Sequence, residues 1–126
     1  MASSLQHGKA REPVAVAILA LPEATASVIY GMYDLFRGAG RDWGVVTTGE
    51  PGPELLRPQV VSSRSGSFVA ANGVRITPEA ALEQCVAPQI VCVPEVAIAP
   101  GTRIAGRFAA EVDWLRRRHA CGATIA

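Results

Sequence analysis

The sequence predicts an α/β fold of three layers, α/β/α, built around a mostly parallel sheet. Short, continuously apolar segments alternate along the chain with segments whose apolar residues recur at helical spacing. This alternation is typical of a parallel sheet that helices cover on both faces. The length of 126 residues fits one domain, and 49% hydrophobic residues against 18% charged residues provide a core for it.

The first strand is predicted over residues 14–21, eight apolar residues in succession. A bilayer span needs about 20 residues, so this segment is too short for a transmembrane helix. A helix follows, for which Thr25 or Ser27 can cap the start and Gly38 and Gly40 can form the end. Its apolar stripe consists of Val28, Ile29, Met32, Leu35, Phe36 and Ala39.

Extended segments and a proline-rich loop are expected next. Residues 43–48 are predicted as a second strand, and residues 50–58, with three prolines and a glycine, as a loop. Residues 59–63 and 67–71, joined through Gly66, predict a hairpin or an excursion at the rim of the sheet.

The middle of the chain predicts a short extended piece, a helix and a strand. The extended piece covers residues 74–76, and the strand is a buried one over residues 89–93. Between them Thr77 can cap a helix whose first position is Pro78. The inward-facing residues of this helix are expected to be Ala81, Leu82 and Cys85.

The longest helix is predicted from Thr102 to about His119. The pairs Arg107–Glu111 and Asp113–Arg117 have the spacing of surface ion pairs. The inner face of the helix is expected to hold Ile104, Phe108, Val112 and Leu115.

Residues 123–126 are predicted as a last strand, pairing centrally in a flavodoxin-like sheet that this chain leaves incomplete. In such sheets ligands bind at the carboxyl ends of the strands. Glu23 follows the first strand and Glu95 follows the strand at 89–93, so both are candidate ligand-binding residues. The alternative for each is an acidic residue that stabilises the dipole of a following helix.

No residue is predicted to be catalytic or to bind a metal or a cofactor. Gly38-Ala39-Gly40 follows a helix rather than a strand, so it is no phosphate-binding loop, and a GxSxG motif is absent. His7 and His119 are far apart in the sequence. The cysteines lack the spacing of a zinc site; they are Cys85, Cys92 and Cys121.

Net charge, the N-terminal segment and the cysteine count indicate which partners and which cellular location to expect. The net charge of +1 disfavours unaided binding of nucleic acid, and residues 116–118, three arginines, are expected on a solvated helix face. Residues 1–12 lack periodicity and are predicted to be a mobile leader before a domain over residues 13–126. A signal peptide is the alternative, but Glu12 and Glu23 flank its apolar segment. Because the odd cysteine count gives no disulfide framework, a cytoplasmic location is expected.

Five segments together resemble the ThiJ/PfpI family, which has the class I glutamine amidotransferase-like fold. The resemblance covers nearly the whole chain from about Pro13 and is strongest to the N-terminal ligand-sensing domain of AraC-type (GlxA-like) transcriptional regulators. The segments are VAVAILALPE, YGMYDLFRGAGRDW, VRITPEAALEQ, PQIVCVPE and AEVDWLRRRHACGATIA.

The chain departs from the enzymes of that family at three places. The family's strand that matches residues 123–126 continues into a sharp turn bearing a cysteine, which this chain lacks, so Cys121 is not its counterpart. Ser27 and Val28 stand where the enzymes place a carboxylate, and Glu23 lies a turn earlier. Residues 94–96, Pro-Glu-Val, replace a frequent Gly-Gly that offers donors to an oxyanion.

The resemblance therefore implies a ligand-sensing or dimerising domain of an AraC-type regulator that is not catalytic by itself and takes an unknown small-molecule ligand. DNA would be bound only through a domain absent from this chain, and no membrane partner is expected. The alternative is a fragment of a ThiJ/PfpI enzyme, isonitrile hydratase-like or glyoxalase-like, whose catalytic cysteine lies beyond Ala126. Exposed apolar surface beside the uncovered last strand predicts self-association.

Overall fold

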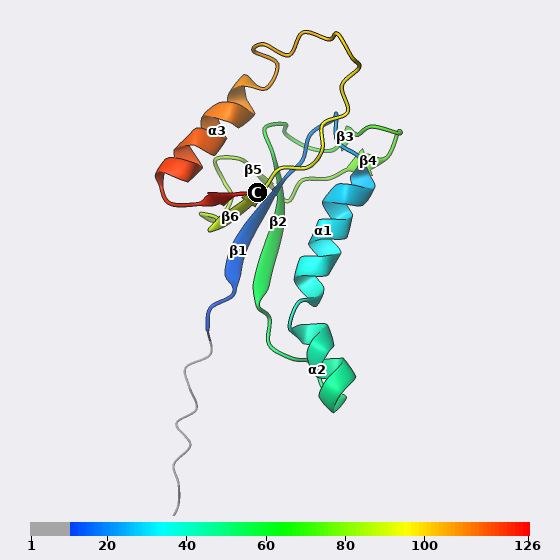
Figure 1. Cartoon of the computed structure of the whole chain (residues 1–126), viewed down its shortest axis with the longest axis vertical. Helices are drawn as coiled ribbons and strands as arrows, with labels where there is room; N and C mark the ends of the chain where they lie inside the picture. The colour runs from blue at the N-terminus through cyan, green and yellow to red at the C-terminus, as the bar shows by residue number, and fades with distance from the viewer. Residues whose placement is uncertain (1–10) are drawn as a thin grey trace, which may run out of the picture.

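A computed structural model describes residues 11–126 of the chain (Figure 1). Within them Arg11 and Glu12 precede the first strand without regular structure. The rest of the predicted leader, including His7, lies outside the described residues. Of the helices in residues 11–126, none has the length and the apolar character needed to cross a membrane.

Five parallel strands form the main sheet, in the order β5-β2-β1-β6-β7. The central strand β1 (Val14–Leu19) pairs with β2 (Leu56–Ser62) on one side and with β6 (Ile90–Cys92) on the other. β5 (Ala80–Ala81) and β7 (Thr124–Ile125) form the edges. Apart from the two-residue β5, the chain order of neighbouring strands is 2-1-3-4, as in flavodoxin-like sheets. The predicted fold class is confirmed.

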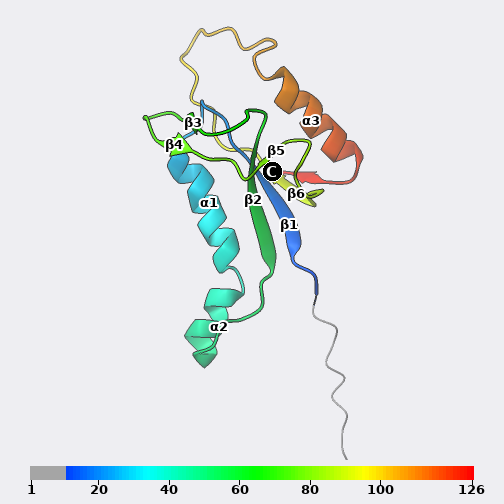
Figure 2. The ribbon, with the colours of Figure 1, turned by 180° about the vertical axis from the view of Figure 1, so that it is seen from behind.

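Helices lie on opposite sides of this sheet, as Figures 1 and 2 show. α1 (Ala26–Gly38) packs on β1 and β2, and α3 (Ala109–Ala120) packs beside β7. Each contributes one fully buried side chain, Ile29 from α1 and Trp114 from α3. The strands between them are apolar on both faces, with Ile18 and Val91 fully buried. Continuous apolar strands are expected where helices cover both faces.

The first helix follows its prediction closely in extent but only partly in burial. It starts after Thr25 and ends at Gly38, and Gly40 takes a positive φ of 78° that turns the chain. Ile29 is fully buried, whereas Val28 and Leu35 are 37% and 74% exposed. The buried side of α1 is therefore narrower than the apolar stripe in the sequence.

The predicted strand over residues 43–48 is wrong, because these residues form a helix, α2 (Arg41–Thr48). No residue of α2 is buried, and its Trp43 side chain is 71% exposed. The position beside β1 is taken by β2, so the β-forming Val and Thr side chains have no sheet to join. A close backbone approach holds α2 instead, since a Cβ on Gly44 would lie 2.2 Å from the Gly52 nitrogen.

The predicted hairpin between residues 59–63 and 67–71 is also wrong. Gln59 belongs to β2 in the middle of the sheet and pairs in parallel with Ala17. The hairpin lies further along the chain, where β3 (Phe68–Val69) pairs with β4 (Arg75–Ile76). The predicted extended piece at residues 74–76 thus becomes one of its strands. Asn72 and Gly73, at φ 68° and 80°, turn the chain between them.

A helix after Thr77 does not form. The backbone nitrogens of Glu79 and Leu82 donate to the carbonyls of Val60 and Ser62, at 2.8 and 3.1 Å, and so extend the sheet through β5. In a helix that starts at Pro78 the Leu82 nitrogen would donate to the Pro78 carbonyl, and its bond to Ser62 takes the place of that helical bond. Burial of two of the three predicted inward residues is confirmed, since Leu82 and Cys85 are 5% and 8% exposed.

The last helix begins at Ala109, not at Thr102, and its buried residue is Trp114. Ile104 and Val112, expected inside, are 57% and 41% exposed. The residues before Ala109 form turns rather than a helix.

The two predicted ion pairs have different outcomes. Asp113 and Arg117 form theirs, at 3.2 Å between Oδ2 and Nε. Arg107, placed outside the helix, cannot reach Glu111 along a helical turn and pairs elsewhere. The strand at residues 123–126 forms as β7, but it lies at the edge of the sheet rather than in its centre.

Candidate functional site

The carboxyl ends of β1 and β6 mark the place where a site is expected. β1 connects forward to β2 on one side and neighbours β6 on the other, so the strand order reverses between β1 and β6. In open α/β sheets ligands bind in the crevice outside the strands at such a point. The loops that leave these two strands carry Glu23 and Glu95.

Glu95 is held against the start of α1. Its Oε1 accepts a hydrogen bond from the backbone nitrogen of Thr25, at 3.1 Å, and another from the Thr25 hydroxyl. Thr25 is the N-cap residue of α1, and its own side chain makes no capping bond. The hydroxyl bond, followed by the backbone bond, lowers the pKa of Glu95 below its ordinary value. Glu95 thus supplies the negative charge that favours a helix N-terminus.

Glu23 joins the β1–α1 turn to the start of α3. Its Oε1 accepts hydrogen bonds from Nε and Nη2 of Arg107, at 3.3 and 3.1 Å. The side chain of Glu23 is only 17% exposed, against 43% for Arg107. Its backbone carbonyl also accepts a bond of 2.7 Å from the nitrogen of Ala97. One residue therefore fixes two distant points of the segment between β6 and α3.

A cavity of about 350 Å³ opens beside this ion pair. Ser63 and Arg64 line it from the end of β2, and the Ser63 hydroxyl donates to the Glu111 carboxylate of α3. Two arginines and two glutamates face one space, so their charges balance. The other lining residues are Leu21, Pro22, Gly106, Phe108, Ala109 and Ala110. A concave space of this size with a few polar groups suits a small polar molecule. We call it the carboxyl-edge cavity.

The two sequence-predicted candidates thus have different surroundings. Glu23 lines the carboxyl-edge cavity, whereas Glu95 lies outside its lining and contacts Thr25. Both remain predictions.

Sequence reasoning missed Ser63, Arg64, Arg107 and Glu111. The first two follow directly on β2, so the rule that selected Glu23 would have found them once residues 56–62 were recognised as a parallel strand. Arg107 and Glu111 were interpreted as an ion pair within one helix. Because α3 starts only at Ala109, Arg107 lies before the helix and pairs with Glu23, whereas Glu111 lies on the helix and accepts from Ser63.

The thiols lie elsewhere in the described part of the chain. Cys85 and Cys92 are buried, and burial raises the pKa of both. Cys121 is exposed and follows the end of α3. No described cysteine lines the carboxyl-edge cavity. Residues 11–126 also contain no group of three His, Cys, Asp or Glu side chains that could hold a metal ion.

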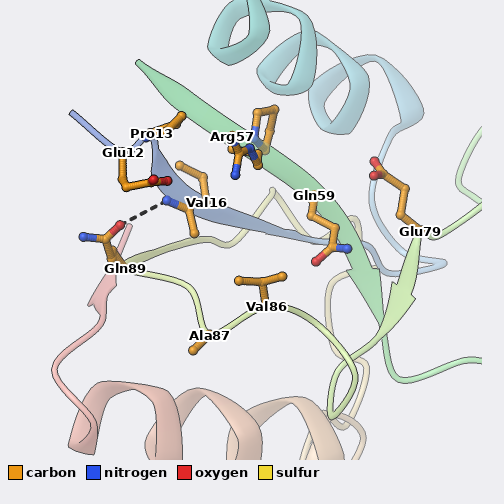
Figure 3. Close-up of a pocket in the computed structure, with 11 residues that line it drawn as sticks. Glu12, Pro13, Val16, Arg57, Gln59, Glu79, Val86, Ala87 and Gln89 are labelled. Atoms are coloured by element: carbon orange, nitrogen blue, oxygen red, sulfur yellow. Dashed lines mark hydrogen bonds between the residues drawn. The ribbon is translucent and has the colours of Figure 1, made fainter. Parts of the chain in front are cut away.

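A second cavity, of about 420 Å³, lies at the amino ends of β1 and β2 (Figure 3). Gln59 and Val86 face each other across it, and the Gln89 Oε1 accepts a bond of 3.1 Å from the nitrogen of Ala15. Its walls are mostly apolar. It occupies the edge opposite to Glu23 and Arg107, where the strands begin, so it is not the site that the fold predicts.

Solved structures of several proteins are similar to this chain along most of its length. A proposed transcriptional regulator from Vibrio parahaemolyticus has a TM-score of 0.64 at 16% identity, over 90% of this chain and 55% of that one. A ThiJ/PfpI family protein from Pseudomonas syringae has a TM-score of 0.64 at 17% identity, over 92% and 42%. An AraC family transcriptional regulator from Pseudomonas putida has a TM-score of 0.61 at 11% identity, over 90% and 54%.

No family model matches the sequence, and no curated protein does. The chain spans about half the length of the three solved structures, between 42% and 55%. Identities below 20% establish the architecture and not the activity. The resemblance inferred from the sequence is therefore confirmed at the level of structure: this chain has the α/β fold seen in the ThiJ/PfpI family protein and in the matched part of the AraC family regulator.

Proposed function

We propose that this chain is a ligand-sensing or dimerising ThiJ/PfpI-like domain of an AraC-type transcriptional regulator and is not catalytic by itself. The observation that carries the proposal is the carboxyl-edge cavity, where the Glu23–Arg107 ion pair and the Ser63–Glu111 hydrogen bond lie at the carboxyl ends of β1 and β2. A small polar molecule could replace one partner in these contacts, for example by pairing with Arg107 in place of Glu23. Such an exchange binds the molecule and does not by itself catalyse a reaction. Two similar structures described as regulators support the choice of class.

A binding experiment tests the sensing role. Small polar molecules would be screened by ligand-observed NMR, and binders mapped by amide shifts in the ¹⁵N-labelled chain. We expect shifts at residues 21–23, 63–64 and 106–111, and weaker binding in an Arg64→Ala variant. Val86→Ala, in the cavity at the opposite edge, is the matched control. Binders that map only to the Val86 cavity, or affinity unchanged by Arg64→Ala, would refute the site.

A second candidate is a fragment of a ThiJ/PfpI enzyme, isonitrile hydratase-like or glyoxalase-like, with its catalytic cysteine beyond Ala126. The position of Ala126 favours it, since the carbonyl of Ala126 accepts a bond of 2.8 Å from Val93, at the carboxyl end of β6. A cysteine on a turn directly after Ala126 would lie at the same edge as Glu23. Cloning the reading frame beyond Ala126 and assaying turnover before and after substituting that cysteine distinguishes the two candidates.

The proposed regulator would associate with itself, sense an unknown small molecule in the cytoplasm, and bind DNA only through a domain outside this chain. Exposed apolar side chains support self-association, among them Leu35, Trp43 and Val46 at 74%, 71% and 78%. Free cysteines in the described residues are compatible with a reducing compartment. Light scattering should detect a dimer or larger species; a monomer at all concentrations would contradict this part.

A further inference from the structure

The segment between β6 and α3 crosses the edge of the sheet where the strands end, and few hydrogen bonds join it to the rest of the described chain. Residues 96–107, which we call the strap, arch away from the ends of the strands before the chain returns at α3 (Figure 1). Residues 99–107 are all exposed. Within the strap Thr102 donates to Ala99, at 3.1 Å, and Arg107 donates to Ile104, at 3.0 Å. These bonds are local and do not fasten the strap to the sheet.

Every hydrogen bond that joins the strap to other described residues ends on Glu23. Near its start the nitrogen of Ala97 donates to the Glu23 carbonyl, at 2.7 Å. At its end Arg107 donates through Nε and Nη2 to the Glu23 carboxylate. The first tether is a backbone bond that no charge change removes. The second is a partly exposed ion pair, which salt and a competing charge can weaken.

Two glycines allow the part between these tethers to swing. Gly101 and Gly106 adopt φ of 80° and 77°, in the left-handed region that favours glycine. An added Cβ at either position would meet nothing within 4 Å, so open space surrounds both. Gly106 directly precedes Arg107, and both line the carboxyl-edge cavity. Movement about these glycines therefore changes one wall of that cavity.

We propose that the strap is a gate of the carboxyl-edge cavity and that the Glu23–Arg107 ion pair is its latch. With the pair formed, residues 106–108 close one wall; when the pair breaks, the strap turns about Gly101 while Ala97 stays bound. Ligand entry is thereby coupled to separation of Arg107 from Glu23. The importance of this gate rests on the proposed sensing function, but the latch is a property of the unliganded chain.

Limited trypsin digestion of the folded chain, without any ligand, tests the latch. Arg103 is exposed inside the strap, and cleavage after it requires the strap to extend locally into the protease active site, which a tether at Arg107 slows. Glu23→Gln removes one charge of the pair and keeps the backbone carbonyl. We expect it to speed cleavage after Arg103 about five-fold, the upper end for a single exposed ion pair. Arg107→Met, which removes the other charge, should have the same effect.

Two comparisons separate a latch from general destabilisation. The double variant with Glu23→Gln and Arg107→Met should cleave no faster than either single variant, because both remove one shared interaction. Arg117→Met is the matched control. Arg117 lies on α3 and forms ion pairs with Asp113 of the same helix and with Glu83, which follows β5. Losing these pairs should leave the rate of cleavage after Arg103 unchanged. Urea unfolding of each variant shows that the compared chains are folded.

Salt gives an independent readout. Raising the ionic strength screens the pair, so cleavage after Arg103 should accelerate in the unaltered chain relative to Glu23→Gln. Equal rates in the unaltered chain and Glu23→Gln, or additive effects in the double variant, would overturn the latch. Absence of any ligand in the NMR screen would overturn the sensing function and leave this result standing. The two failures are therefore distinguishable.

Discussion

Trp114 offers the sharpest test of how α3 is attached to the sheet. Its side chain is fully buried, whereas Trp43, the other tryptophan, is 71% exposed on α2. Replacing a buried tryptophan by alanine costs about 3–5 kcal/mol, from lost apolar burial and from the cavity left behind. We expect Trp114→Ala to lower the free energy of unfolding by about 4 kcal/mol. Trp43→Ala should change it by less than about 0.5 kcal/mol.

A phenylalanine at the same position separates packing from polarity. The Nε1 of Trp114 is buried and has no hydrogen-bond partner among the described residues. Leaving such a group unpaired costs about 1–3 kcal/mol, which Trp114→Phe removes while retaining one aromatic ring. Removing the unpaired nitrogen offsets much of the packing lost with the smaller ring. The free energy of unfolding of Trp114→Phe should therefore lie within about 1 kcal/mol of that of the unaltered chain.

Urea unfolding followed by circular dichroism measures these differences, because the helical signal does not depend on the tryptophan that is removed. The slope of the transition should stay constant among the variants. If Trp114→Phe were as destabilising as Trp114→Ala, the indole nitrogen would have a partner and the argument from its isolation would fail. If both cost less than about 1 kcal/mol, Trp114 would not fasten α3 to the sheet at all.

Two further predictions concern pH and close backbone packing. The pKa of Glu95 is lowered in the folded chain, chiefly by the Thr25 hydroxyl, so its stabilising effect is present above its pKa in the unfolded chain and is lost as pH falls through the lowered folded value. Urea midpoints between pH 6 and 3 should therefore fall less in Glu95→Gln than in the unaltered chain; parallel curves would contradict the Thr25 contact. Gly44→Ala should destabilise the chain, because its Cβ would lie 2.2 Å from the Gly52 nitrogen, whereas Gly31→Ala, with nothing within 4 Å, should stabilise α1 by about 0.5–1 kcal/mol. Thermal unfolding compares the two, and equal shifts would show that the approach at Gly44 is not tight.

Local signals predicted the elements that form the centre of the fold. Residues 14–21 are continuously apolar, and the observed β1 is buried on both faces as that pattern requires. The helix after it carries both a stripe and glycine end signals, so its extent agreed with Ala26–Gly38. Glu23 was found because its position depends only on the end of a strand that the sequence marks clearly.

Elements whose identity depends on a distant partner were predicted less well. Residues 43–48 contain β-forming side chains, yet the place beside β1 belongs to β2, and they became α2. Thr77 and Pro78 have the chemistry of a helix start, but the backbone donors that follow pair with β2. In the first case the hydrogen bonds between β1 and β2 left no place for residues 43–48 in the sheet. In the second, hydrogen bonds to β2 outweighed a local helix preference of a few tenths of a kcal/mol to about 1 kcal/mol per residue.

The sequence by itself determined the α/β class, the central strand, the helix that follows it and the loop positions of Glu23 and Glu95. Only the tertiary structure decided that Arg107 meets Glu23, that Ser63 meets Glu111 and that Glu95 turns to Thr25. The physical reason is range. Periodicity and capping act over a few residues of one segment, whereas these contacts join residues 84, 48 and 70 positions apart, which only the packed sheet brings together.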